Sequence, residues 1–327
     1  MNMKLQKEYL LRYTPVGVIA LLLLTLPLYA DLSIVSLITK ILIFGLLVMS
    51  LDLLVGYTGL MAFGHAAFFG IAGYTVAILG KHYNVTSFWL AAPAGIFMAV
   101  FVACIFGLVA LRVSGVYFLL ITLAMGQLIY GIVHTSVGPL GALTGGSDGL
   151  GGVQYPEMFG YAFEAETFYY FSFAACLICC FLLYWITKSP FGYGLQGIRE
   201  NETRARALGY NTWLYQYIAF VIGGLFAGIA GVLYIYYNGF ISPEGVGIGA
   251  SGFLWLMLII GGSGTLWGSI IGAAVILVLQ YFVGGLTPER WPLILGVCFV
   301  GVIMFYRGGI LPQLINLWRR VINGRSA

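Results

Sequence analysis

The segment VGYTGLMAFGHAAFFGIAGYTVAILG, residues 55–80, is largely apolar, yet it carries glycine at positions 56, 59, 64, 70, 73 and 80. Each glycine inside a helix costs roughly 0.5–1 kcal/mol relative to alanine, so this density argues against one plain transmembrane helix. Irregular backbone is tolerated at membrane depth only where protein or a water-filled cavity surrounds it. The segment therefore predicts a broken or re-entrant helix within a membrane protein.

A second segment of the same kind lies in the other half of the chain. WLMLIIGGSGTLWGSIIGAAVILVLQ, residues 255–280, is interrupted by glycines at 261, 262, 264, 268 and 272. Two glycine-broken segments in corresponding positions are typical of transporters built from repeats, so we predict an inverted repeat. The same small residues also suit close helix packing, and the two interpretations can hold together.

The composition of the whole chain points the same way. Of the 327 residues, 61% are hydrophobic and 8% charged, and the mean hydropathy is +0.99; soluble domains are about a quarter charged. At about 30 residues per span with its loop, the chain suits roughly ten helices. A membrane barrel would require alternating apolar and polar residues, a pattern that is absent. The predicted fold is one all-α polytopic transmembrane domain over residues 1–327.

The distribution of basic residues predicts the orientation. We place the N-terminus in the cytoplasm. Of the fifteen Lys and Arg residues, Lys81 and Arg290 then lie outside the cell membrane, Lys40 lies in a span, and the others lie on the cytoplasmic side, as the positive-inside rule requires. The first 30 residues also resemble a cleaved signal peptide, but we expect an uncleaved first span. The expected spans are approximately 15–30, 33–55, 60–80, 88–110, 115–137, 167–187, 213–238, 250–263, 265–285 and 292–306.

Two segments outside the spans have unusual charge. The expected extracytoplasmic loop 138–166 contains acidic residues and no Lys or Arg, whereas the cytoplasmic segment 194–211, GLQGIRENETRARALGYN, concentrates both signs. As a helix, 194–211 would align Leu195, Ile198, Ala205 and Leu208 along one apolar stripe, and Gly209 and Asn211 would end it. Such a helix either rests on lipid headgroups or docks a soluble partner.

Few ionisable groups lie within the expected spans. Lys40 and Asp52 lie towards span ends, whereas His65 follows a glycine in the broken segment and could face a translocation path. A packed neutral histidine is the favoured alternative for His65. The candidate path residues are Tyr57, Gly64, His65, Gln127, Gly261 and Gly264.

The motifs that resemble enzyme signatures lack the sequence context that catalysis requires. GGSDG at 145–149 fits G-x-S-x-G, but that motif needs a preceding strand, and every histidine precedes both this serine and the one in GGSG at 261–264. No P-loop motif occurs, so ATP would have to be hydrolysed by a separate chain. The five cysteines lie in apolar runs without metal-ligand spacing, and we expect no catalytic residue, metal or cofactor.

Five stretches together resemble the permease subunits of branched-chain amino acid ABC importers. They cover nearly the whole chain in the expected order, and TGGSDGL at 144–150 resembles one of that family's two paired permeases. The resemblance implies a bacterial inner-membrane importer with a second permease, two ATP-binding subunits and a periplasmic substrate-binding protein. The chain would be surrounded by membrane lipid and would bind no nucleic acid. The stretches are 51–75, 143–150, 198–211, 234–246 and 259–276.

The resemblance also implies roles for individual residues. Segment 194–211 would be the coupling helix that enters a cleft on the ATPase, through Ile198, Arg199, Glu200, Glu202, Arg204, Ala205, Leu208 and Gly209. The loop 138–166 would contact the binding protein through Gly145, Gly146, Ser147 and Asp148.

Two residues depart from the family pattern, and two other functions stay open. Asp52 stands where an uncharged amide is expected and Gln127 where an acid is common. One alternative is a urea or short-amide permease of the same family. The other is an ion-coupled secondary transporter, which would be expected to hold acidic residues deep in the membrane.

Overall fold

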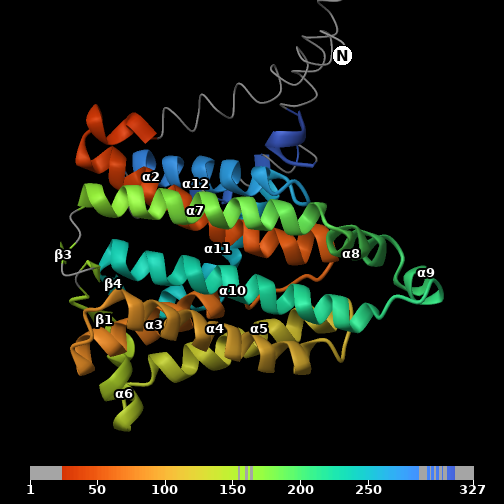
Figure 1. Ribbon diagram of the computed structural model, residues 1–327, viewed down its shortest axis with the longest axis horizontal. Helices are drawn as coiled ribbons and strands as arrows, with labels where there is room; N and C mark the ends of the chain where they lie inside the picture. Colours follow the sequence, from red (N-terminus) through yellow and green to blue (C-terminus); the bar gives the residue numbers. More distant parts are fainter. Residues whose placement is uncertain are drawn as a thin grey trace, which may run out of the picture.

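The computed structural model describes residues 24–153, 155–158, 161–162, 165–286, 293–294, 296–297, 300–301, 304 and 308–313. It is an elongated bundle of helices (Figure 1). The principal helices are α2 (Leu32–Asp52), α3 (Ala66–Tyr83), α4 (Phe88–Ala110), α5 (Val116–His134), α7 (Ala165–Lys188), α10 (Thr212–Asn238), α11 (Ile248–Gly261) and α12 (Trp267–Leu286).

Six helical segments within this part of the chain are long and apolar enough to cross a membrane. They are Leu32–Thr58, Phe88–Ala110, Val116–His134, Glu166–Lys188, Thr212–Asn238 and Trp267–Gly284, and α11 is a shorter apolar helix. This confirms an all-α polytopic membrane protein. The predicted spans 15–30 and 292–306 lie largely outside the described residues, so ten helices and an inverted repeat stay predictions.

The helices form layers that run along the long axis of the molecule. In Figure 1, α2, α7 and α12 lie on one side, α3, α4 and α5 on the other, and α10 and α11 between them. Helix α10 packs on α2, α3 and α4, and α12 packs on α2. Small residues permit this: a Cβ on Gly231 of α10 would lie 2.1 Å from the carbonyl oxygen of Phe69 in α3.

The outer surface of the bundle carries large apolar side chains. Trp89, Phe97, Phe181 and Trp185 are all exposed. Soluble proteins rarely expose contiguous apolar patches of this kind, but hydrocarbon chains of lipid satisfy them. Cys176, Cys179 and Cys180 are buried, Cys104 is half-buried, and Cys298 lies outside the described residues.

The two ends of the bundle carry different structures. One, here called the strand end, holds α6 (Gly138–Thr144), η3 (Gly146–Asp148), β1 (Leu150–Gly151), β2 (Glu157–Met158), β3 (Tyr161–Ala162), β4 (Phe240–Ile241) and η4 (Pro243–Gly245). β1 pairs antiparallel with β4, and β2 with β3. The other, here called the coupling end, holds α8 (Pro190–Glu200) and α9 (Glu202–Ala207) (Figure 1). Segments 138–166 and 194–211 thus lie at opposite ends.

Both predicted breaks are present. Helix α2 continues into a π-helix, η2 (Leu53–Thr58), which ends at Gly59 in the left-handed region (φ 79°); residues 59–65 are not helical, and α3 begins at Ala66. Helix α11 ends at Gly261, and the turn 262–266 holds Gly262 and Gly264 at positive φ before α12 begins. Side chains with a Cβ rarely adopt that conformation, which explains the glycines at these turns.

Candidate transport site and coupling face

The two breaks meet at the coupling end of the bundle. Asp52, the last residue of α2, is 0% exposed, and its carboxylate accepts hydrogen bonds from the backbone amides of Gly264 (2.6 Å) and Leu266 (2.9 Å). Gly56 of η2 packs so closely on this turn that a Cβ there would lie 2.3 Å from the Gly264 nitrogen. The first broken segment is therefore bonded directly to the second.

Arg199 of α8 completes this junction. Its guanidinium donates to the carbonyl oxygen of Gly56. A Cβ on Gly59 would lie 3.0 Å from Cγ of Arg199, and one on Gly264 would lie 3.3 Å from its Nη1. The arginine side chain therefore extends over the first break and ends beside the second. We call Asp52, Gly56, Arg199, Gly264 and Leu266 the three-way junction.

The predicted single helix over 194–211 is wrong. Asn201 adopts an extended conformation (φ −160°, ψ 99°) that ends α8, and its side chain accepts from the amide of Arg204 to cap α9. Asparagine is among the preferred N-cap residues, which accounts for the break. Gly209 follows the end of α9 at positive φ, and Asn211 caps the start of α10 instead of ending a helix.

The predicted apolar stripe is only partly buried. Leu195, Ile198 and Ala205 face the protein. Leu208, by contrast, is 72% exposed, and the nearby Tyr193 is 58% exposed. Because α9 turns away after Asn201, Leu208 cannot stay in line with the residues of α8. The coupling end therefore presents apolar side chains outwards.

Charged residues of this segment have separate surroundings. Glu202 and Arg206 form an ion pair of 2.6 Å across one turn of α9, and the hydroxyl of Thr212 at the start of α10 bonds to both. Glu200 and Arg204 are exposed. The charged residues of 194–211 thus divide into Arg199 at the junction, a pair that fixes α9 on α10, and two exposed side chains, Glu200 and Arg204.

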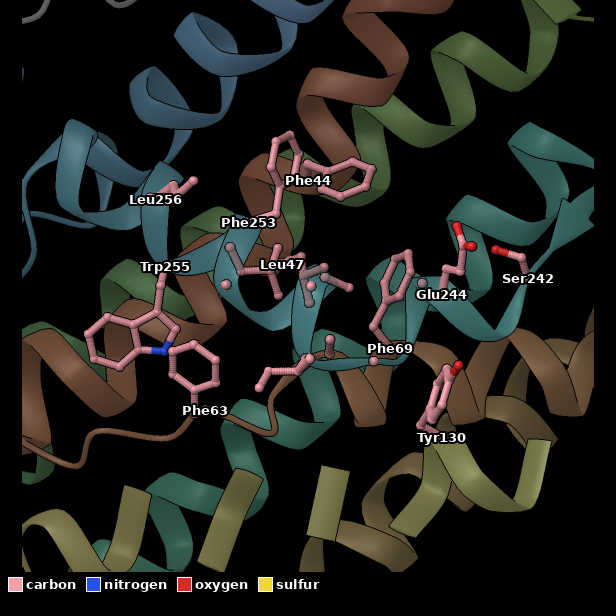
Figure 2. A pocket seen from close by; sticks show the side chains of 18 of the residues that line it. Phe44, Leu47, Phe63, Phe69, Tyr130, Ser242, Glu244, Phe253, Trp255 and Leu256 are labelled. Atoms are coloured by element: carbon pink, nitrogen blue, oxygen red, sulfur yellow. The ribbon is translucent and has the colours of Figure 1, made fainter. Parts of the chain in front are cut away.

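A cavity of about 1330 Å³ extends along α11. Its walls come from α2, the start of α3, α5, α10, the β4–η4 region, α11 and α12, and they are mostly apolar (Figure 2). Among the described residues that line it, Glu244 alone is charged. The cavity therefore suits an organic molecule with a large apolar part.

The two ends of the cavity differ. At one, Phe63 and Trp255 stack with ring centroids 6.0 Å apart, and the indole N–H of Trp255 donates to the carbonyl oxygen of Ala62 (2.9 Å). At the other lie Tyr130, Ser242 and Glu244 (Figure 2). One end of the cavity is thus lined by two aromatic rings, one on the first break and one on α11, and the other end is polar and lies towards the strand end.

Only one of the predicted path residues lines the cavity, namely Gln127. His65 is buried, its Nε2 is 2.7 Å from the hydroxyl of Ser50, and its ring packs edge-on against Phe68. His65 is thus packed away from the cavity in this structure, as in the alternative interpretation, and its assignment to the path stays a prediction. Tyr57 and Gly264 lie outside the cavity lining: Gly264 belongs to the three-way junction, and Tyr57 follows Gly56 in η2.

The remaining two path glycines serve close packing. A Cβ on Gly64 would lie 2.0 Å from the carbonyl oxygen of Thr122 in α5, and one on Gly261 would lie 1.9 Å from that of Gly268. The interpretation of these glycines as small packing residues therefore holds together with the breaks. Phe63, Trp255 and Glu244 were missed as candidates because nothing in their local sequence shows that they line one cavity.

The predicted binding-protein contacts lie at the strand end. Ser147 and Asp148 are exposed in η3. Gly146 is buried, and a Cβ on it would lie 2.4 Å from the hydroxyl oxygen of Ser136. The glycines thus shape the turn, and the serine and aspartate are accessible from outside the bundle.

A bundle of lipid-facing helices with two broken segments beside an apolar cavity defines a multi-pass membrane transport protein. The chain belongs to the family of branched-chain amino acid transport system permease components, whose model matches residues 33–306.

Individual relatives agree with this assignment. The high-affinity branched-chain amino acid transport system permease protein LivM of Escherichia coli (strain K12) is 27% identical over 80% of this chain and 66% of its own length. LivM of Salmonella typhimurium is 27% identical over 75% of this chain and 62% of its own. The chain thus spans slightly less than two thirds of these relatives.

A third similarity is shorter. The autoinducer 2 import system permease protein LsrC of Photorhabdus laumondii is 36% identical, but over 30% of this chain and 31% of its own length. No solved structure gives a significant match.

Proposed function

We propose that this chain is the permease subunit of an ATP-driven ABC importer for branched-chain or related amino acids. It would work with a second permease, two ATP-binding subunits and a periplasmic substrate-binding protein in the bacterial inner membrane, with both termini cytoplasmic. The observation that carries the proposal is the family match over residues 33–306, and the names of the LivM relatives favour this substrate class.

The cavity supports an amino acid with an apolar side chain as cargo. Phe44, Phe63, Phe253 and Trp255 offer aromatic surface to such a side chain (Figure 2). The carboxylate of Glu244 is placed to attract an ammonium group. The first turn of α11 also lines the cavity, and its N-terminus has no side-chain cap, which favours a substrate carboxylate.

The coupling end supports docking of a soluble ATPase. Helices α8 and α9 extend beyond the main bundle (Figure 1), and they expose Tyr193 and Leu208 together with Arg204. Apolar side chains rimmed by charge are typical of protein interfaces, where charge sets register and partner choice. At the opposite end, exposed Ser147 and Asp148 would contact the substrate-binding protein.

A urea or short-amide permease is the competing function, and no structural observation favours it. Urea is small and polar, so aromatic walls would leave most of its hydrogen-bonding groups without partners.

The test is reconstitution of the chain with its ATP-binding, permease and binding-protein partners in vesicles. Uptake of labelled leucine and of labelled urea is compared in the presence and absence of ATP. We expect ATP-dependent leucine uptake. ATP-dependent urea uptake without leucine uptake would contradict the substrate, and uptake without ATP would contradict the importer class.

A further inference from the structure

We propose that Arg199 is the positioning residue that transmits movement of α8 to both glycine-broken segments at once. The inference rests on the proposed function, because α8 is taken to be moved by the ATPase. It differs from the role that the resemblance implied, which was a direct contact between Arg199 and the ATPase.

The contacts of Arg199 lead inwards. Its guanidinium donates to the carbonyl oxygen of Gly56, and its aliphatic stem lies over Gly59. A helix must release backbone carbonyls where its regular bonding pattern ends, and the π-helix η2 ends at Gly59. Arg199 satisfies one such carbonyl from a different helix, so η2 and α8 cannot separate without losing a charge-assisted hydrogen bond.

Asp52 extends this connection to the second break. Its buried carboxylate accepts from the amides of Gly264 and Leu266. A buried charge without partners is costly, so this carboxylate holds the 262–266 turn firmly to the end of α2. The absence of a side chain at Gly56 lets its backbone approach that of Gly264, since a Cβ there would lie 2.3 Å from the Gly264 nitrogen and 2.1 Å from Oδ1 of Asp52.

The junction is continuous in the chain with both segments that line the aromatic end of the cavity. Residues 59–65 form the first break and carry Phe63, and α11, which leads into the second break at Gly262, carries Trp255. Phe63 stacks on Trp255. A shift of α8 passed on through Arg199 would therefore move the segments that bear both rings of the stack. This gives a physical route from the coupling end to the cavity.

The experiment uses the complete reconstituted complex and measures leucine transported per ATP hydrolysed. In Arg199→Met the guanidinium is lost while the apolar stem is kept. We expect the complex to assemble and hydrolyse ATP near the wild-type rate, with at least about a fivefold fall in leucine per ATP, the lower range of a typical coupling free energy. Arg199→Lys keeps a donor and should recover part of the ratio.

Arg112→Met is the matched control. Arg112 is exposed in the turn between α4 and α5, so this variant removes an arginine from outside the junction and should leave the ratio at the wild-type value. A wild-type ratio in Arg199→Met would overturn the proposal. So would a parallel loss of assembly and ATP hydrolysis in Arg199→Lys, because that result would mean that the residue serves docking.

A second measurement keeps the proposal falsifiable if Arg199→Met does not assemble. Amide hydrogen exchange of residues 262–266 is followed in the wild-type complex with and without a non-hydrolysable ATP analogue. We expect the analogue to change exchange at Gly264 and Leu266. Unchanged exchange would overturn the proposal whatever the cargo, whereas wild-type complex that imports no leucine would contradict the proposed function instead.

Discussion

The carboxylate of Asp52 lies 2.6 Å from the backbone nitrogen of Gly264, although 212 residues separate them in the chain. This bond joins the end of a helix in the first half to a glycine turn in the second. Neither residue stands out in its local sequence, because an aspartate near a span end and a glycine in a turn are both common. Their meeting makes the two breaks one structural unit, and it suggests what each part should do when altered.

Replacement of Asp52 should destabilise the fold in proportion to the hydrogen bonds lost. Asp52→Ala leaves the buried amide of Leu266 and the half-buried amide of Gly264 without an acceptor, and a buried unsatisfied group costs about 1–3 kcal/mol. Asp52→Asn retains one acceptor oxygen and should cost less. Thermal unfolding of the purified chain in detergent gives the order, wild type above Asn above Ala. Equal stability of wild type and Asp52→Ala would contradict the bonding described here.

Gly56 should tolerate no side chain. In Gly56→Ala the new methyl group would lie 2.3 Å from the Gly264 nitrogen, and such overpacking typically costs about 1–3 kcal/mol. Gly80→Ala in α3 is the control, since no atom lies within 4 Å of a Cβ at that position. Unfolding temperatures of the two variants measure the effect. A similar temperature for both would show that the contact at Gly56 is looser than described.

Much of this fold could be predicted from sequence, because the signals are local. Apolar run length gave the long helices, and glycine density located both breaks. The positive-inside pattern placed segments 138–166 and 194–211 on opposite sides, and they do lie at opposite ends of the bundle. The helices and the breaks follow from neighbouring residues alone, and the placement of the two segments needs only the distribution of basic residues along the chain.

What the sequence could not predict depends mostly on contacts between distant parts of the chain. His65 follows a glycine break, which suggested a path, but in the structure its hydrogen-bond partner Ser50 comes from another helix. The division of 194–211 at Asn201 follows from an asparagine in the N-cap position, a local signal that the prediction of a single helix did not use. Glu244 and Trp255 gain meaning only from the cavity that several helices enclose.

Leu208 should contribute to ATPase docking and not to the stability of the permease. Because it is 72% exposed, Leu208→Gln removes apolar surface from the coupling end without opening a gap in the core. We expect unchanged unfolding of the isolated chain and weaker co-purification with the ATP-binding subunits. Tyr83 is exposed at the C-terminal end of α3, and the Tyr83→Gln variant should bind the ATP-binding subunits normally. Equal loss in both variants would indicate a general effect of polar substitution.

Glu244 should contribute to transport through its charge. In Glu244→Gln the side chain keeps its size and hydrogen-bonding ability but no longer attracts an ammonium group. Because the residue is solvent-exposed, we expect a moderate effect, roughly a two- to fivefold lower rate of leucine uptake at limiting substrate. Glu244→Asp keeps the charge and should lie nearer the wild type. ATP hydrolysis and assembly should stay normal in both, since the residue lies at the end of the bundle away from α8. If uptake in Glu244→Gln equalled that of the wild type, this carboxylate would have no role in substrate recognition. Recognition within the cavity would then depend on the aromatic walls.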